Sequence, residues 1–485
     1  MARSTSGACA DSASGTGSRV GRTSQHQEAP VHQPHPAEPG SVAPEWVPHP
    51  DNAVIARSGL ENFERVFGRR PEGIWQSPGR ANLNGEHIDF LGGRCLPMAL
   101  PYGTLVAAAP RTDGLLRMRT LEPTLDEGIV EVRVEDIGPG RPEGWTGYVA
   151  GALWGLHEVA ECTPGISIPE GFGADMLIRS TLPVGGGLSS SAALECASIL
   201  AFAGMITGSD EHDDARRAAL AHACMMAEVR VVGANTGGLD QTASLRSHAG
   251  QVVSLDCRDF SITYRSADAL LDGHRLIGVD TRTPHWLGGH EFSSRRLDAE
   301  AAARFLGADR LRDLLPETPS QDDVETVLRR WEDAAPTAEQ LEGRDPGDAF
   351  RRLRHALTEM LRSEQIDALL AGETGVSVPC AVGRILTSGH ASMRDDAEAS
   401  FAAADLIVDT ALSAGADGAR LIGGGFGGSV LMLVPERNVE AVTAAVAAAV
   451  VKAHLPSVRF LDIQPADSGH LVCRDCVELA GMGCS

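Results

Sequence analysis

Three glycines followed almost directly by three serines place the tightest constraint on the fold of this chain. They lie in the stretch Leu182-Pro183-Val184-Gly185-Gly186-Gly187-Leu188-Ser189-Ser190-Ser191-Ala192-Ala193. Glycine lacks a Cβ, so a ligand can approach the backbone closely, and the apolar residues that follow predict a helix beginning at the serines. Free N–H groups at a helix start bind phosphate, and a serine hydroxyl there can reach Mg²⁺. The same residues also fit a helix start that is simply capped by serine.

This glycine motif differs from the two commonest nucleotide-binding motifs. A Walker loop requires a lysine directly after its last glycine, whereas Lys452 is the sole lysine of the chain. The glycine spacing is not the GxGxxG of a dinucleotide fold either. A phosphate site here must therefore use backbone dipoles, arginine and a metal. The formal net charge of −23 repels nucleic acid and anionic membranes, so neither is an expected partner.

The chain of 485 residues is long enough for two domains and a tail. Residues 1–48 are rich in Ser, Gly, Ala, Pro and His, a composition that predicts disorder. After about residue 276 the sequence changes to long helical patterns rich in Arg, Glu and Ala. We therefore expect a disordered tail over 1–48, an N-terminal domain over 49–275 and a C-terminal domain over 276–485.

Hydrophobic periodicity predicts a mixture of helices and strands without regular βαβ repeats, which indicates the α+β class. The predicted strands lie at 73–75 and 96–109, and the predicted helices lie within 46–67, at 147–159, after 185–187, at 294–306 and at 347–361. No apolar stretch approaches the ~20 residues that span a bilayer, and the N-terminus shows no signal peptide. The scattered cysteines fit reduced thiols. We expect a cytoplasmic protein that is a monomer or a weak dimer.

Two further stretches carry chemically suggestive residues. Arg80, Glu86, His87 and Asp89 crowd around a glycine turn. The Glu, His and Asp side chains suit either metal ligation or hydrogen bonding to several sugar hydroxyls, although a solvated loop would also explain them. Near the C-terminus, five glycines precede the strand-like run 430–434. Their backbone must press against a ligand or against another strand.

These three stretches, in this order, resemble the galactokinases of the GHMP kinase superfamily, whose signatures run close to GRVNLIGEHTDY, PxGxGLSSSAALE and GGGFGG. The resemblance covers most of residues 50–470. It implies the two-domain GHMP kinase fold, with an N-terminal domain like domain 2 of ribosomal protein S5 and a ferredoxin-like α+β C-terminal domain. It also implies a kinase that uses ATP and Mg²⁺ to phosphorylate the anomeric hydroxyl of a monosaccharide, with galactose 1-phosphate as the expected product.

Roles carried over from the resemblance fall on particular positions. Asp240 would be the catalytic base that accepts the proton of the C1 hydroxyl, and Arg80 would stand beside it and the γ-phosphate. Ser191 and Glu228 would bind Mg²⁺. The residues expected to hold the ATP phosphates are Gly185, Gly186, Gly187, Leu188, Ser189, Ser190 and Ser191. Those expected at the sugar are Glu86, His87, Asp89, Gly237 and Phe292. The glycines expected to border the site from the second domain are Gly423, Gly424, Gly425, Gly427 and Gly428.

The match departs from the family pattern around the expected sugar site. Asn84 and Phe90 replace an aliphatic residue and a tyrosine, and Phe292 stands where EYNTRR of the family has a tyrosine that donates to the sugar. One lost hydrogen bond is worth about 1 kcal/mol. A kinase of the same fold acting on another acceptor, such as arabinose, an amino sugar or a cyclitol, is therefore an alternative. A sugar sensor without turnover is a third, against which the retained Arg80, Ser191, Glu228 and Asp240 argue.

Overall fold

The computed structural model describes residues 43–474, apart from 162, 164, 184, 235, 284–289 and 373–375. All of the described residues lie in one compact unit. Of the tail expected over 1–48, residues 1–42 lie outside the described part of the chain. The segment Glu45–Trp46 forms strand β1, so regular structure begins shortly before the expected boundary at residue 49.

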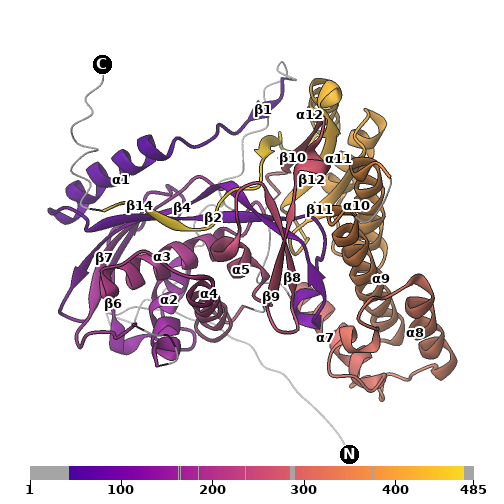
Figure 1. The fold of residues 1–485 in the computed structure, drawn as a ribbon, viewed down its shortest axis with the longest axis horizontal. Helices are drawn as coiled ribbons and strands as arrows, with labels where there is room; N and C mark the ends of the chain where they lie inside the picture. Colours follow the sequence, from indigo (N-terminus) through magenta and orange to yellow (C-terminus); the bar gives the residue numbers. More distant parts are fainter. Residues whose placement is uncertain are drawn as a thin grey trace, which may run out of the picture. The chain divides into compact units, whose positions relative to one another are not determined.

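A six-stranded sheet forms the first half of the fold (Figure 1). Its strand order is β14 (His470–Arg474), β2 (Gly73–Asn82), β4 (Pro97–Arg111), β7 (Gly173–Ser180), β5 (Leu115–Thr120) and β6 (Val130–Arg133). Neighbouring strands are antiparallel except β5 and β7, which run parallel. The register of β2 with β4 shifts between Pro78 and Arg80, next to the end of the sheet that carries the predicted sugar residues.

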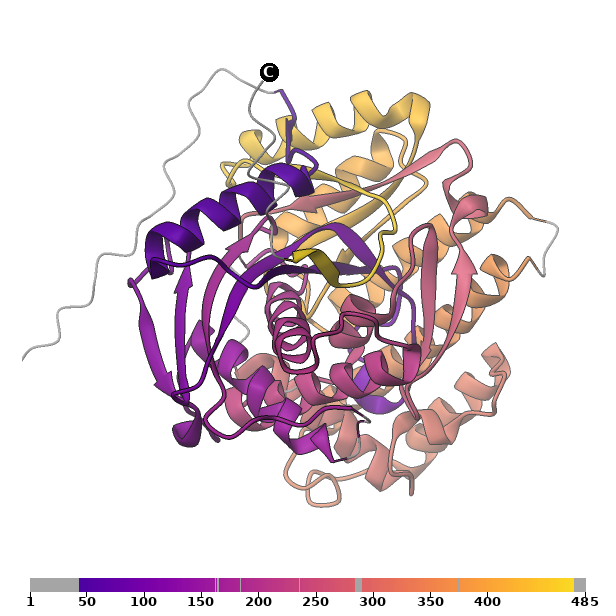
Figure 2. The ribbon, with the colours of Figure 1, turned by 60° about the vertical axis from the view of Figure 1, so that its left-hand side comes forward.

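Helices cover both faces of this sheet (Figures 1 and 2). Helices α2 (Trp145–Ala160), α3 (Ser190–Thr207) and α4 (Asp214–Ala227) bury their apolar side chains against one face. Helix α1 (Asn52–Phe67) packs on the other face. Asp51 caps α1 by accepting hydrogen bonds from the backbone N–H groups of Ala53 and Val54, and Gly68 ends it in the left-handed conformation.

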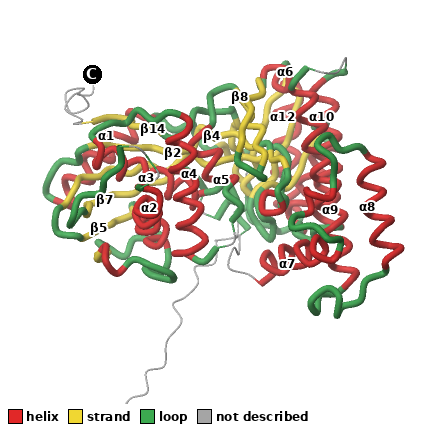
Figure 3. The backbone as a smooth tube through the Cα atoms, turned by 60° about the horizontal axis from the view of Figure 1, so that its bottom comes forward, coloured by secondary structure: helices red, strands yellow, loops and turns green. Residues whose placement is uncertain are grey.

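A five-stranded sheet organises the second half of the fold. Its strand order is β1, β13 (Arg459–Ile463), β10 (His274–Asp280), β12 (Ser429–Pro435) and β11 (Gly418–Ile422). Helices α11 (Ala402–Ser413) and α12 (Val439–Lys452) pack on one face. Helices α9 (Pro346–Leu370) and α10 (Val378–Asp395) share an apolar cluster with the other face. Figure 3 shows α9 and α10 side by side.

A third, small sheet of β3 (Arg94–Cys95), β8 (Gln251–Asp256) and β9 (Ser261–Ser266) lies between these halves. It shares an apolar cluster with α7 (His290–Phe305), α8 (Gln321–Ala334) and α9. Helix α6 (Asp268–Leu271) leads into β10. Each end of the described chain adds a strand to the sheet of the opposite half: β1 pairs with β13 in the five-stranded sheet, and β14 pairs with β2 in the six-stranded sheet. A domain boundary at residue 275 stays a prediction, and two pairs of strands cross it.

The α+β class predicted from the sequence is confirmed, and each predicted helix and strand has a counterpart in the fold. The membrane expectation needs one correction. Helix α3 is 18 residues long and apolar enough to qualify as a candidate membrane span by length and composition, but 67% of it is buried inside the protein. Such burial is typical of a core helix, and α3 lies between the six-stranded sheet and helices α2 and α4.

Candidate active site

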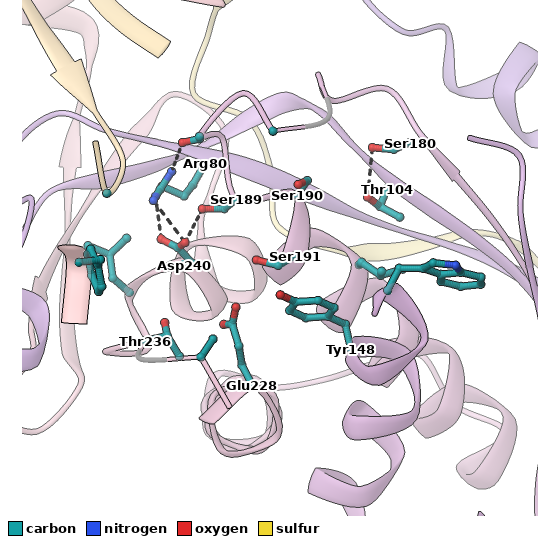
Figure 4. A pocket seen from close by; sticks show the side chains of 18 of the residues that line it. Arg80, Thr104, Tyr148, Ser180, Ser189, Ser190, Ser191, Glu228, Thr236 and Asp240 are labelled. Carbon is teal, nitrogen blue, oxygen red and sulfur yellow. Dashed lines mark hydrogen bonds and ion pairs between the residues drawn. The ribbon is translucent and has the colours of Figure 1, made fainter. Parts of the chain in front are cut away.

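One cavity of about 360 Å³ gathers most of the residues singled out in the sequence. It lies where β2, the start of α3, the turn after α4 and the start of α5 (Leu239–Arg246) come together (Figure 4). The predicted residues that line it are Arg80, Glu86, His87, Asp89, Gly185, Gly187, Ser189, Ser190, Ser191, Glu228, Asp240, Phe292 and Gly424. The predicted residues that do not line it are Gly186, Leu188, Gly237, Gly423, Gly425, Gly427 and Gly428.

The serines at the start of α3 do not form an ordinary helix cap. Ser189 occupies the N-cap position in the left-handed conformation, with φ 58° and ψ 48°, and its side chain caps no backbone N–H. Its hydroxyl instead donates to Asp240 Oδ2 at 2.5 Å. A non-glycine residue in this conformation is strained. The alternative of a plain serine cap therefore does not describe Ser189, and Ser189, Ser190 and Ser191 all line the cavity.

Arg80 and Asp240, which both line the cavity, form an ion pair beside Ser189 (Figure 4). Arg80 Nε lies 2.7 Å from Asp240 Oδ1, and Arg80 Nη2 donates to Asp240 Oδ2 at 3.2 Å. Nη1 of the same guanidinium donates to the carbonyl of Gly187 at 3.0 Å. Burial alone would lower the pKa of Arg80, but the carboxylates of Asp240 and Glu86 raise it overall. Arg80 thereby joins the glycine turn to Asp240.

Asp240 stands in the first turn of α5, which begins directly after the left-handed Gly238. Gly237 explains why the start of α5 lies so close to the loop that carries Glu86, His87 and Asp89, which we call the sugar loop. A Cβ at Gly237 would lie 2.3 Å from Asp89 Oδ2 and 2.8 Å from the backbone nitrogen of Phe90, so any larger residue would force this loop to shift. Gly237 therefore allows the segment before α5 to pass against Asp89, although it does not itself line the cavity.

Three carboxyl groups at the cavity have raised pKa values. Burial raises the pKa of Glu86 to about 7, an effect that Arg80 partly offsets. Burial and the charge of Asp240 raise the pKa of Asp89 to about 6 and that of Glu228 to about 7. Glu228 begins a π-helical turn, Glu228–Val232, that continues α4, and a hydrogen bond with Ser191 lowers its pKa. A local excess of acidic groups is therefore held beside one arginine, a setting suited to a cation.

The glycine loop of the second sheet touches the predicted sugar residues directly. The N–H of Gly423 donates to Glu86 Oε1 at 2.8 Å, and His87 Nε2 lies 2.9 Å from the carbonyl of Gly424. Burial and the neighbouring His355 lower the pKa of His87 to about 3. His87 is therefore neutral and donates from Nε2 to Gly424, and this contact is structural.

The same loop packs on the glycine turn that precedes α3. Ser429 Oγ donates to the carbonyl of Gly186 at 2.6 Å. A Cβ added to Gly423 would lie 2.9 Å from the carbonyl oxygen of Gly187, and one added to Gly187 would lie 3.3 Å from the Cα of Gly428. Most of these glycines therefore serve a close backbone-to-backbone approach, and Gly424 alone among the five lines the cavity.

The departures from the family pattern occupy two different environments. Phe292 on α7 lines the cavity, with its ring centroid 5.0 Å from that of His87 and 6.0 Å from that of Phe90. Asn84, which the sequence analysis placed around the sugar, does not line it. Asn84 is fully buried, accepts a hydrogen bond from Arg420 and donates to Ser363 Oγ at 2.8 Å. That part of the sugar-site expectation was wrong, because Asn84 belongs to a buried polar network.

Sequence reasoning assigned no role to the other end of the cavity. Its walls combine apolar side chains with threonine and serine hydroxyls from several strands; the residues are Thr104, Thr120, Glu122, Leu125, Trp145, Tyr148, Ile178, Ser180 and Leu194. An apolar pocket with a few polar groups suits a flat nucleobase. Most of these residues come singly from separate elements, so no short stretch of sequence indicates that they meet.

Models of known protein families match segments in both halves of the chain. Residues 61–110 match the galactokinase galactose-binding signature. Residues 147–248 match the N-terminal domain of the GHMP kinases, and residues 380–452 match their C-terminal domain. The fold, the cavity at the start of α3 and these matches together define a GHMP kinase.

Whole-chain similarity narrows the class to one family. The chain is 40% identical to the galactokinase of Streptomyces coelicolor over 414 residues, covering 85% of this chain and 97% of that protein. It is 34% identical to the galactokinase of Bos taurus over 396 residues, covering 79% and 89%. The chain belongs to the galactokinase family. It is therefore a sugar kinase with ATP as its phosphoryl donor, and the alternative of a sensor without turnover is set aside.

Solved structures agree with this assignment. The fold matches that of Lactococcus lactis galactokinase complexed with galactose with a TM-score of 0.73 and 26% identity, covering 86% of this chain and 99% of that chain. Methanococcus jannaschii mevalonate kinase matches with a TM-score of 0.50 at 17% identity, covering 81% and 98%. The latter likeness concerns the fold alone. The predicted two-domain GHMP kinase fold is confirmed.

Proposed function

We propose that this protein transfers the γ-phosphoryl group of ATP to the C1 hydroxyl of galactose, yielding galactose 1-phosphate and ADP. The observation that carries the proposal is the Arg80–Asp240 pair, which joins β2 to the start of α5 inside one cavity, in contact with Gly187 and Ser189 before α3. Galactose enters as the acceptor because residues 61–110 match the galactose-binding signature. Glu86, Asp89 and Asp240 supply the hydrogen-bond acceptors that sugar hydroxyls require.

In the proposed reaction, Asp240 accepts the proton of the C1 hydroxyl as the hydroxyl oxygen attacks the γ-phosphorus. The bond between that phosphorus and the β–γ bridging oxygen breaks, and ADP leaves. Arg80 reaches both Asp240 and Gly187, so its guanidinium offsets charge that spreads over the phosphoryl oxygens. The backbone of the glycine turn and Ser190 at the start of α3 hold the other phosphates. Phosphoryl transfer depends on such positioning more than on covalent chemistry.

We propose Ser191 and Glu228 as the protein ligands of Mg²⁺. Their hydroxyl and carboxylate oxygens are the donors that this hard cation prefers, and Mg²⁺ in kinases usually takes one or two protein carboxylates together with substrate phosphates and water. The described residues contain no cluster of three His, Cys, Asp or Glu side chains that could hold a metal unaided, as expected for a cation that arrives with its nucleotide. Bound Mg²⁺ neutralises phosphate charge.

Further features of the proposal concern the protein as a whole. We propose an N-terminal domain over 49–275 that carries the sugar and ATP motifs, with a C-terminal domain over 276–485 that contributes the glycine loop. A net charge of −23 favours an enzyme without nucleic-acid or membrane partners. We propose a cytoplasmic monomer or weak dimer.

A panel of acceptors tests the proposed reaction. Purified protein with ATP and Mg²⁺ should release ADP with galactose, and the product should show the phosphorus NMR signal of a sugar 1-phosphate. Arabinose, galactosamine, glucose and inositol should give lower kcat/KM values. If galactose is inert while another of these acceptors turns over, the proposed substrate is wrong and the alternative of a same-fold kinase stands.

The apolar wall at Phe292 leads to a prediction about sugar affinity. Phe292→Tyr adds a hydroxyl in the cavity, where one hydrogen bond to a sugar is worth about 1 kcal/mol. We expect the KM for galactose to fall by roughly threefold to tenfold, with kcat nearly unchanged. Phe90→Tyr is the matched control, because Phe90 contacts the Phe292 ring but does not line the cavity. Equal effects of the two substitutions would contradict this account of Phe292.

The raised pKa of Glu228 predicts how nucleotide binding depends on pH. Its carboxyl has a pKa of about 7 in the protein, and only the ionised form holds a cation. The gain in ADP affinity that Mg²⁺ provides should therefore increase by up to about tenfold per pH unit as the pH rises toward 7, and level off above it. Titration calorimetry across this range measures the gain. In Glu228→Gln, any remaining pH dependence should come from titration of the nucleotide itself. Identical pH profiles for the two proteins would contradict the prediction.

A further inference from the structure

Gln241 bridges two acidic side chains beside the cavity. It follows Asp240 on α5 and is fully buried. Its Nε2 donates to Glu228 Oε2 at 2.5 Å and to Glu195 Oε2 at 3.1 Å. A side-chain amide has two N–H donors, so these contacts use both of them.

Glu195 holds the far end of this bridge. It lies on α3, one turn after Ser191, and its side chain is fully buried. Among the described residues, Glu195 Oε2 accepts from Gln241, and Oε1 has no hydrogen-bond partner. A buried polar group without full satisfaction costs stability. A role in stability alone gives no reason to keep a carboxylate at this position, since an apolar residue would pack there without that cost.

The bridge determines how Glu228 presents its carboxylate. Because Gln241 fixes Oε2, the carboxylate cannot rotate freely about its last side-chain bond. It points toward Ser191 at the start of α3 (Figure 4). The same helix that supplies Ser191 supplies Glu195, and the same helix that supplies Asp240 supplies Gln241. The bridge therefore fixes the two proposed metal ligands relative to each other and to the proposed base.

We propose that Gln241 and Glu195 are positioning residues, which form a buried bracket that aims the Glu228 carboxylate at the divalent cation of the bound nucleotide. The inference rests on the proposed function, in which Glu228 is a metal ligand. Residues that orient metal ligands typically change metal affinity by 10–100-fold when they are replaced. The bracket thus acts on binding of the metal–nucleotide complex and not on nucleotide binding without metal.

Calorimetry with ADP, in the presence of Mg²⁺ and in the presence of EDTA, tests the bracket. The dissociation constant measured with EDTA, divided by that measured with Mg²⁺, gives the ratio by which the metal strengthens ADP binding. Gln241→Met should lower that ratio by about tenfold or more, and Glu195→Met should lower it in the same direction. Glu195→Gln keeps an oxygen that can accept from Gln241 and should retain most of the ratio. Should Gln241→Met fail to fold, Gln241→Glu keeps the shape, replaces the donor by an acceptor and should lower the ratio likewise.

Two controls separate the possible failures. Thr242→Val removes a buried hydrogen bond within α5, from Thr242 Oγ1 to the carbonyl of Gly238, and should lower the melting temperature without changing the ratio. In Glu228→Gln, Mg²⁺ should no longer strengthen ADP binding. If it still does, the proposed metal role of Glu228 fails. If Glu228→Gln removes the effect of Mg²⁺ on ADP binding while the Gln241 variants lose only thermal stability, the proposed bracket is wrong and the metal role of Glu228 stands.

Discussion

Asp240→Asn is expected to lower kcat for galactose phosphorylation by about 10³-fold, the scale on which a positioned general base contributes. Asparagine keeps the shape of the side chain but cannot accept the proton of the C1 hydroxyl. ADP release under saturating substrates measures the loss. Calorimetry with ADP and Mg²⁺ should give a dissociation constant close to that of the unaltered protein, because no nucleotide contact is assigned to the carboxylate.

The matched control for this substitution is Asp367→Asn. Asp367 is also a largely buried aspartate paired with an arginine, Arg265, at 2.8 Å, but it does not line the cavity. Its replacement should alter stability and leave kcat unchanged. Equal losses of kcat in the two variants would mean that breaking an Arg–Asp pair, and not losing the proposed base, lowers activity.

Glu359→Leu is expected to lower the free energy of unfolding by about 3–5 kcal/mol, the range for breaking a buried ion pair. Glu359 and Arg420 are both fully buried, and Glu359 Oε1 lies 2.8 Å from Arg420 Nη2. The substitution leaves the buried guanidinium without a carboxylate. The N–H of Gly85 also donates to Glu359 Oε1 at 3.0 Å, so the KM for galactose should rise as the sugar loop loses its anchor. Urea unfolding measures the first effect.

The pH dependence of stability provides a second test of this pair. Burial alone would raise the pKa of Glu359, but Arg420 and Arg362 hold it well below its ordinary value. The carboxylate therefore contributes stability at neutral pH, and this contribution is lost as the pH falls below about 4.5, the ordinary pKa of glutamate. Glu359→Leu should lack that component. The double variant Glu359→Leu with Arg420→Met should recover part of the lost stability, and a loss below about 1 kcal/mol for Glu359→Leu alone would contradict the account.

The parts of the fold that the sequence predicted are those governed by local rules. The periodicity of 147–159 and the capped start of the helix over 52–67 depend on neighbouring residues, and both helices were anticipated. Hydrogen bonds between distant residues were not. The bond from Gly423 to Glu86 and that from Arg420 to Asn84 each join positions more than 300 residues apart. Nothing in the surrounding sequence indicates such a partner.

The residues of the candidate site also fall into two groups: those that belong to short local motifs, and those that only the fold brings together. Arg80, Ser191 and Asp240 belong to short motifs, and the fold brings all three to the wall of one cavity. Thr104 and Ile178 line it only because β4 and β7 are neighbours in the sheet, a topology that no single stretch encodes. Conversely, the glycines around 423–428 looked like a ligand-binding loop, yet Gly423 and Gly428 lie against the backbone of Gly186 and Gly187, and Gly425 lies against that of Ala399. A glycine run shows that something lies close without showing what.

The central claim is that the Asp240 carboxylate meets the acceptor hydroxyl next to the terminal phosphate of ATP. A crystal structure with galactose, Mg²⁺ and a non-hydrolysable ATP analogue tests it most directly. The account predicts an Asp240 oxygen within hydrogen-bonding distance, about 2.6–3.2 Å, of the C1 hydroxyl, with Arg80 in contact with the γ-phosphate. A sugar bound with its C1 hydroxyl directed away from Asp240, or a nucleotide whose terminal phosphate lies outside the reach of Arg80, would contradict it.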